Sequence, residues 1–393
     1  MENIKRIEYH DLYEEYEKDV PDNFHQSLNK EQGIETFNTY EDYERSVVEK
    51  SNKNHEMFMI AESLCNSERF KAYITDDYKS ELDKNLELYN IKFDSKEDRN
   101  NIYHYMIHID ELSETKNMGF YDKIEYAKYL MKYDKENGYK ILFSTPILKS
   151  GIVDVNLNDE EVKYNGKYLE YYNPSGISVK APLIEYRKDE NGNLKEYAIE
   201  ASEMDYYIME TNNYYNDIMQ RTYNDYSDNF RNQILENMKS ITLVNANYDN
   251  GWAAFCAKNN RTNSYITIDM NDVMKSPDYM LSTYTHELGH AYAAASSSNN
   301  NFFINNLLNR SDIDNKSEWK NVYNQIIQND SNKTFLKEYA HSSPVECFAE
   351  CVAEFYANSS DDTIYNPNDL KAIDIEINGQ EMTLYDYMDN LLN

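Results

Sequence analysis

Apolar residues recur at helical spacing over the first third of the chain. From about 40 to 137 they fall three and four positions apart, which is the period of an amphipathic helix. The pattern predicts helices at 43–70, 98–112 and 121–135. Asn137-Gly138 ends the last of them. Residues 1–40 are polar and acidic with weak periodicity, so we expect a mainly helical N-terminal domain over 1–138.

Short apolar runs replace the helical pattern beyond this domain. The runs at 139–144 and 151–155 are typical of strands. Asn165-Gly166 and Asn191-Gly192 each separate two such runs, and Asn-Gly is a strong signal for a two-residue hairpin turn. Two hairpins predict a small antiparallel sheet. We therefore expect a β-rich segment over 139–205.

The last part of the chain contains both helical spacing and short strand-like apolar runs. Residues 203–239 return to helical spacing, whereas 241–244 and 264–268 are typical of strands. A further helix follows at Pro277, because proline suits the first helical position. The chain is thus predicted to be α+β, with a third domain over 206–393 in which this helix packs beside a small sheet.

Composition excludes several classes of function. The net charge is −31, with 70 acidic residues against 39 lysines and arginines. So acidic a surface repels nucleic acid and anionic lipid, and it favours cations and basic peptides. No run approaches the roughly 18 apolar residues of a membrane span, and no signal peptide is visible. The four cysteines form no disulfide framework, which suits synthesis in a reducing cytoplasm and leaves non-classical export open.

The pattern H-E-x-x-H lies on the helix that begins at Pro277. His286 and His290 are four residues apart, so they share one helix face and can bind a single Zn²⁺. Glu287 then lies beside the open coordination position, where it can take a proton from a metal-bound water. Strands precede this helix, and an edge strand beside the metal can pair with an extended peptide. The alternative is two ordinary histidines on a helix surface.

A catalytic zinc needs a third protein ligand. The extended pattern H-E-x-x-H-x-x-G-x-x-H is excluded, because its last two positions hold Ala293 and Ser296. The better candidate is a later helix on which three carboxylates form a stripe at a spacing of four: Glu346, Glu350 and Glu354. One carboxylate of such a pair can bind metal while the next accepts the free N–H of a ligand histidine. The alternative is a solvated acidic face that begins with a capping box at Ser343.

The two stretches together resemble the anthrax lethal factor family of zinc metalloproteases, which includes small secreted Pro-Pro endopeptidases. The family pattern is H-E-F-G-H, then Tyr, six residues and E-F-F-A-E. Here H-E-L-G-H is followed by Tyr339 and, seven positions later, by E-C-F-A-E. The close matches cover only 283–296 and 339–358. Leu288 and Cys347 depart from the pattern but remain apolar.

This resemblance implies a zincin-like fold for the last domain and a zinc-dependent endopeptidase that acts on proteins, with Zn²⁺ as its cofactor. It implies three metal ligands, which are His286, His290 and Glu346. It also implies Glu287 as general base, Tyr339 as transition-state donor and Glu350 behind a ligand histidine. The family resemblance also implies delivery as a secreted toxin or effector. The acidic net charge of the chain implies a protein or peptide substrate with basic residues. Two alternatives remain: a regulatory zinc hydrolase of narrow specificity, and a catalytically degenerate zinc-binding structural or virion protein.

Overall fold

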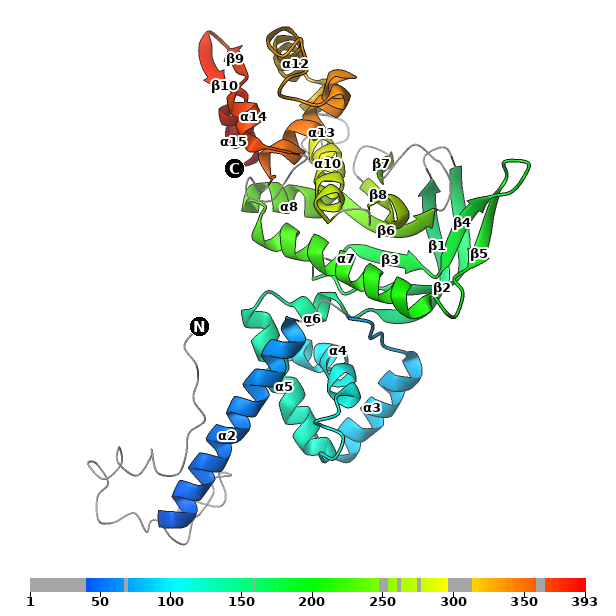
Figure 1. Cartoon of the computed structure of the whole chain (residues 1–393), viewed down its shortest axis with the longest axis vertical. Helices are drawn as coiled ribbons and strands as arrows, with labels where there is room; N and C mark the ends of the chain where they lie inside the picture. The colour runs from blue at the N-terminus through cyan, green and yellow to red at the C-terminus, as the bar shows by residue number, and fades with distance from the viewer. Residues whose placement is uncertain are drawn as a thin grey trace, which may run out of the picture. The chain divides into compact units, whose positions relative to one another are not determined.

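The chain divides into two compact units in the computed structural model (Figure 1). The first comprises Met1–Glu68 and Asp94–Gly138, and the second comprises Arg69–Phe93 and Tyr139–Asn393. The second unit therefore holds both the β-rich segment and the region that carries H-E-x-x-H. The structure describes residues 40–66, 70–157, 160–174, 176–246, 254–259, 263–273, 277–295, 313–357 and 365–393. The predictions for residues 1–39 and for Ser296 lie outside these ranges.

The first unit is helical, as the sequence predicted. Its helices are α2 (Tyr40–Cys65), α4 (Lys96–Glu111) and α5 (Phe120–Glu136). Helix α5 ends at Asn137, and Gly138 follows with a φ of 96°, a conformation that glycine adopts without strain. Helices α4 and α5 pack against each other, and their buried apolar side chains include Ile102, Met106 and Leu130. Helix α3 (Asp76–Leu88) belongs to the second unit.

The second unit contains a curled mixed sheet of eight strands, in which β6 is the central element (Figure 1). Strand β6 pairs in parallel with β3, β4 and β8, and the remaining pairs are antiparallel. The strands are β1 (Ile147–Leu157), β2 (Glu160–Glu170), β3 (Ser178–Pro182), β4 (Ile184–Lys188), β5 (Leu194–Ala198), β6 (Met238–Ala246), β7 (Ala254–Asn259) and β8 (Asn263–Asp269).

The strands predicted around 241–244 and 264–268 are confirmed as parts of β6 and β8, and the hairpin predicted around Asn191-Gly192 is confirmed by the β4–β5 pair. Within the β-rich segment, the pairs β1–β2, β2–β3 and β4–β5 are antiparallel, as predicted. The segment does not form a small sheet of its own, however, because β3 and β4 also pair in parallel with β6. Helices α7 (Met204–Asn224) and α8 (Asp228–Asn237) separate these strands in sequence. They supply the long crossover that parallel pairing requires.

Two local predictions are also wrong. Residues 139–144 contain a one-turn helix, α6 (Lys140–Phe143), which follows Tyr139 in a left-handed conformation. The second error is the hairpin at Asn165-Gly166, because β2 continues through both residues. A Cβ at Gly166 would lie 2.2 Å from the Tyr164 hydroxyl oxygen, so this glycine lets the Tyr164 ring lie close over the backbone.

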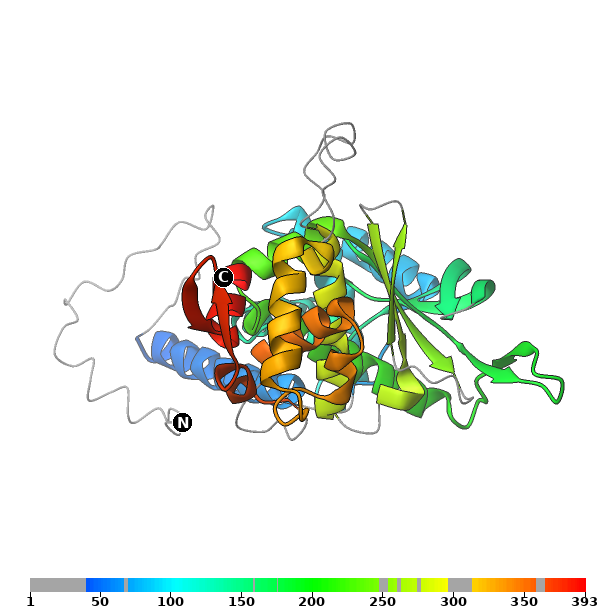
Figure 2. The same ribbon diagram turned by 90° about the horizontal axis from the view of Figure 1, so that it is seen from above.

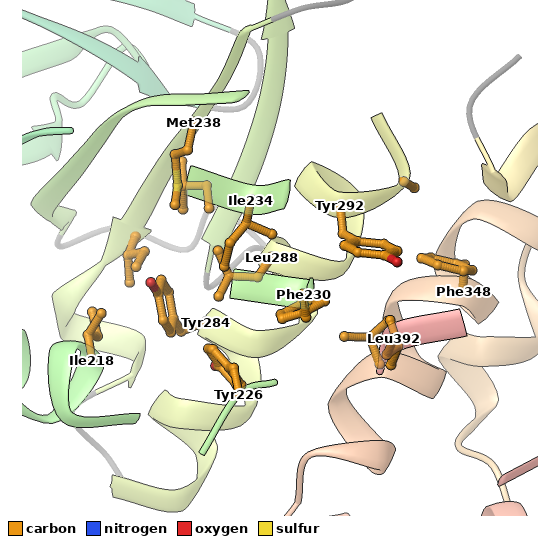
Figure 3. Close-up of a cluster of buried hydrophobic side chains, with 14 of the residues drawn as sticks. Ile218, Tyr226, Phe230, Ile234, Met238, Tyr284, Leu288, Tyr292, Phe348 and Leu392 are labelled. Atoms are coloured by element: carbon orange, nitrogen blue, oxygen red, sulfur yellow. The ribbon is translucent and has the colours of Figure 1, made fainter. Parts of the chain in front are cut away.

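Helices on one side of the sheet carry the candidate site. Helix α10 (Pro277–Ala295) packs against α8, β7 and α13 (Pro344–Phe355) (Figures 1 and 2). Its buried residues Tyr284, Leu288 and Tyr292 share one apolar cluster with Phe230 of α8 and Phe348 of α13 (Figure 3). This cluster fixes α10 along its apolar face, which leaves its other face to position polar side chains.

Shorter elements complete the second unit. They are α9 (Met270–Val273), η2 (Ile313–Asn315), α12 (Ser317–Asn329), η3 (Glu338–His341), α14 (Pro367–Lys371), β9 (Asp374–Ile377), β10 (Gln380–Thr383) and α15 (Leu384–Leu392). Among the helices that the structure describes, none combines the length and the apolar character that a membrane span requires.

Candidate metal centre

Helix α10 presents both histidines of H-E-x-x-H on one face. His286 and His290 are one turn apart, and their Nε2 atoms lie 3.2 Å from each other. The Tyr284, Leu288 and Tyr292 side chains are buried in the core on the other side of the helix. The two imidazoles therefore converge on one point, as a shared metal ion would require.

Helix α13 brings a carboxylate to the same point. The Oε2 atom of Glu346 lies 3.2 Å from His286 Nε2 and 3.3 Å from His290 Nε2. Ser343 caps this helix, since its hydroxyl accepts the backbone N–H of Glu346 at 3.2 Å. The capping interpretation of this segment is thus correct for Ser343. The Glu346 carboxylate, however, lies beside the histidines.

The acidic stripe on α13 is not a solvated helix face. Glu350 and Glu354 are only 4% and 2% exposed. The Oε1 atom of Glu350 lies 3.0 Å from Nδ1 of His286, on the opposite side of the ring from Glu346. One carboxylate thus faces each nitrogen of His286, and Glu350 is placed to orient the ring.

Gly289 allows α10 and α13 to approach closely. A Cβ at this position would lie 2.9 Å from Ala349 Cα and 3.2 Å from Val352 Cβ. Carbon atoms in contact are normally about 3.5–4.0 Å apart, so no larger residue fits without displacing α13. In the sequence, Gly289 is distinguished only as a helix-breaking residue within H-E-L-G-H. Its contact with Ala349 brings the carboxylates of α13 within reach of the histidines.

The three convergent atoms can hold a metal ion. Among the His, Cys, Asp and Glu side chains in the described parts of the chain, those of His286, His290 and Glu346 form a group of three whose ligand atoms lie close enough to share an ion. Glu346 Oε2 is buried and has no hydrogen-bond partner of normal geometry among the described residues, although both Nε2 atoms are within 3.3 Å. A buried carboxylate oxygen directed at two imidazole nitrogens fits a shared cation, which would satisfy all three groups.

The pKa values in the cluster favour a proton on His286, between the two carboxylates. Burial lowers the pKa of His286, but the close carboxylates of Glu346 and Glu350 outweigh burial and raise this pKa to about 10. Burial raises the pKa of Glu346, but the two histidine rings beside its carboxylate outweigh burial and hold this pKa well below its usual range. A metal ion binds neutral imidazole, so it would replace this proton between the same side chains.

Glu287 and Tyr339 flank the cluster. Burial raises the pKa of Glu287, whose carboxylate accepts the backbone N–H of Cys256 on β7. Tyr339, on η3, has its ring centroid 5.8 Å from that of His286 and is 54% exposed. Burial and the nearby charge of Glu346 raise the pKa of Tyr339 to about 12, so its phenol stays protonated near neutral pH. The site thus combines a buried carboxylate with an accessible hydroxyl donor.

All six side chains selected from the sequence lie in this one region of the second unit: His286, Glu287, His290, Tyr339, Glu346 and Glu350. The last His of the chain, His341, has a different environment, since its Nε2 lies 3.3 Å from Asp330 Oδ2. Asp330 also accepts the backbone N–H groups of Thr334, Phe335 and Leu336, which orders the loop that leads to Tyr339. The role of Asp330 was not predicted from the sequence, in which it is only a single aspartate at the end of a helix.

Comparison with known proteins gives no assignment. A scan against protein-family models, a search of curated proteins and a search of solved structures each found no match. The resemblance to the lethal factor family therefore rests on the motif residues alone. Their spatial arrangement is the remaining source of information about function.

Proposed function

We propose that the chain is a zinc-dependent endopeptidase of the kind that the lethal factor family represents. The observation that carries the proposal is the triangle of His286 Nε2, His290 Nε2 and Glu346 Oε2, with sides of 3.2–3.3 Å. Ligands about 2.0–2.1 Å from a tetrahedral zinc ion lie roughly 3.3–3.4 Å apart. Two imidazoles and one carboxylate are also a ligand set that catalytic zinc uses, whereas Ca²⁺ and Mg²⁺ prefer oxygen ligands.

Glu287 and Tyr339 supply the remaining chemistry of peptide hydrolysis. When bound, Zn²⁺ would polarise the scissile carbonyl group and make a coordinated water more acidic. The Glu287 carboxylate accepts a proton from the attacking water and passes it to the leaving amine. Its buried position and raised pKa suit a group that must both take and return a proton. The Tyr339 hydroxyl donates a hydrogen bond to the oxyanion that develops on the substrate.

An extended polypeptide is the substrate that the surroundings favour. Strand β7 packs against α10, and within the described residues it pairs with β8 alone. The backbone N–H of Cys256 on this strand bonds Glu287, so the edge of β7 that faces away from β8 runs beside the proposed base. A peptide that adds to such an edge gains backbone hydrogen bonds in an extended conformation. The net charge of −31 favours basic residues near the scissile bond.

Peptide-library digestion with defined metal content tests this function. The purified chain, stripped with a chelator and then reconstituted, should bind about one zinc ion per molecule. Cleavage should disappear with the chelator, return with zinc, and weaken at high salt for basic substrates. Stoichiometric zinc without cleavage of any peptide or protein would identify a structural zinc site. Failure to bind zinc would refute the proposal, and a preference for acidic peptides would refute the charge argument.

A further inference from the structure

A buried tyrosine contacts the carboxylate that lies behind His286. The hydroxyl of Tyr365 donates to Glu350 Oε1 at 3.2 Å. The same oxygen lies 3.0 Å from His286 Nδ1. Tyr365 and Glu350 are both buried, and Tyr365 lies two residues before α14, an element separate from α10 and α13. The three side chains form a line from Tyr365 through Glu350 to a proposed metal ligand.

We propose that Tyr365 is a positioning residue that fixes Glu350 and, through it, the orientation of the His286 imidazole for metal binding. This inference rests on the proposed zinc site. A carboxylate that receives one hydrogen bond can still rotate about its terminal torsion. A hydroxyl donor and an imidazole nitrogen within 3.2 Å of the same oxygen, from different elements, restrict that rotation. The Nδ1 proton of His286 then has a fixed acceptor, which leaves the Nε2 lone pair to the metal.

Two further contacts hold Tyr365 in place. The backbone N–H of Asn366, the next residue, donates to Glu354 Oε2 at 2.5 Å, so α13 also anchors the chain beside the tyrosine. The Nζ atom of Lys337 lies 3.1 Å from the centroid of the Tyr365 ring, within the range of a cation–π interaction. Lys337 is the N-cap residue of η3, the short helix that carries Tyr339. The Tyr365 ring therefore packs between the helix of the carboxylates and the segment of the proposed oxyanion donor.

The chain contains a matched control for the loss of this hydroxyl. Tyr387 of α15 is also buried and donates to a glutamate, Glu318, at the same distance of 3.2 Å. Neither residue of that pair contacts a proposed metal ligand in any hydrogen bond or ion pair found among the described residues. Tyr365→Phe and Tyr387→Phe thus remove the same type of bond, but only the first bond reaches His286.

Zinc affinity, measured by competition with a chromophoric chelator on the full chain, separates the two roles. Tyr365→Phe should weaken zinc binding by about tenfold, the lower end of the range for groups that orient a metal ligand, since it acts through Glu350. Tyr387→Phe should bind zinc as the wild type does. In the metal-free protein, the ¹⁵N and ¹H signals of the His286 imidazole should move in Tyr365→Phe and stay unchanged in Tyr387→Phe.

A double-mutant cycle keeps the proposal falsifiable if Tyr365→Phe also lowers stability. In a Glu350→Gln background the tyrosine has lost the carboxylate through which it acts, so adding Tyr365→Phe should change zinc affinity little further. Additive losses, equal losses in the two tyrosine variants, or a wild-type affinity and spectrum in Tyr365→Phe would overturn the inference and leave the zinc site intact. Absence of zinc binding in the wild type would instead overturn the proposed function and the inference together.

Discussion

Replacing Gly289 by alanine adds one methyl group at the contact between α10 and α13. The added Cβ would lie 2.9 Å from Ala349 Cα, a backbone atom that cannot rotate away. Contact between carbon atoms requires about 3.5 Å or more, so the helices must separate locally by roughly 0.6 Å. Helix α13 carries Glu346 and Glu350, and their carboxylates would move with it.

Two free energies follow from this displacement. Overpacking costs about 1–3 kcal/mol, and alanine recovers about 1 kcal/mol of helix propensity, so the unfolding free energy should fall by about 0–2 kcal/mol. Zinc affinity should be more sensitive to this displacement than the unfolding free energy, because the distance between a ligand atom and its metal ion tolerates a deviation of only about 0.2 Å. A shift of roughly 0.6 Å at Glu346 should therefore weaken zinc binding by at least about tenfold, or about 1.4 kcal/mol.

Urea unfolding and chelator competition measure the two quantities on one preparation. Gly119→Ala is the matched control, because its Cβ would meet only the Asp122 carboxylate at 3.8 Å and it lies in the other unit. That variant should bind zinc normally. Wild-type zinc affinity in Gly289→Ala would refute the idea that close approach of α10 and α13 assembles the site.

Three further predictions concern single carboxylates and the phenol. Glu346→Ala should abolish zinc binding and cleavage together, whereas Glu350→Ala should lose about 10–100-fold in zinc affinity; a titration with the reverse order would place the ligand one helical turn away. Tyr339→Phe should keep its zinc and lose about 10²–10³-fold in kcat, and an unchanged kcat would remove it from the mechanism. Burial raises the pKa of Glu354 from about 4.5 in the unfolded chain to about 8 in the folded chain. The protonated carboxyl group therefore contributes fully to the unfolding free energy below pH 4.5, and this contribution is lost as the pH rises through 8. With a chelator present, the unfolding free energy of Glu354→Gln relative to that of the wild type should therefore rise by a few kcal/mol between pH 5 and pH 8.5. A difference in urea unfolding that does not change with pH would contradict this.

Most residues of the candidate metal centre could be predicted from helical periodicity. Residues four apart share a helix face, so His286 and His290, and likewise Glu346 and Glu350, could each be paired from the sequence. Their convergence across two helices depended on a packing contact that spacing does not encode. The small residues Gly289 and Ala349 were the available signal, because only such residues permit that approach.

Features that depend on long-range contacts were not predictable in this way. Gly166 is followed by no turn, because its missing side chain accommodates the Tyr164 ring within a continuous strand. The parallel pairing of β6 with β3 and β4 joins segments separated by two helices, and no local pattern records such partners. Tyr365 is one of 38 tyrosines, and only its hydrogen bond to Glu350 distinguishes it.

The central claim is that this chain hydrolyses peptide bonds with Glu287 as the proton acceptor beside a zinc ion. The most direct measurement compares wild type and Glu287→Gln at equal, verified zinc content on the best substrate from the peptide library. Glu287→Gln removes the proton acceptor and none of the three proposed ligands, so it should keep about one zinc ion per chain and lose about 10²–10⁴-fold in kcat. Turnover near that of the wild type in a fully zinc-loaded Glu287→Gln would contradict the proposed mechanism.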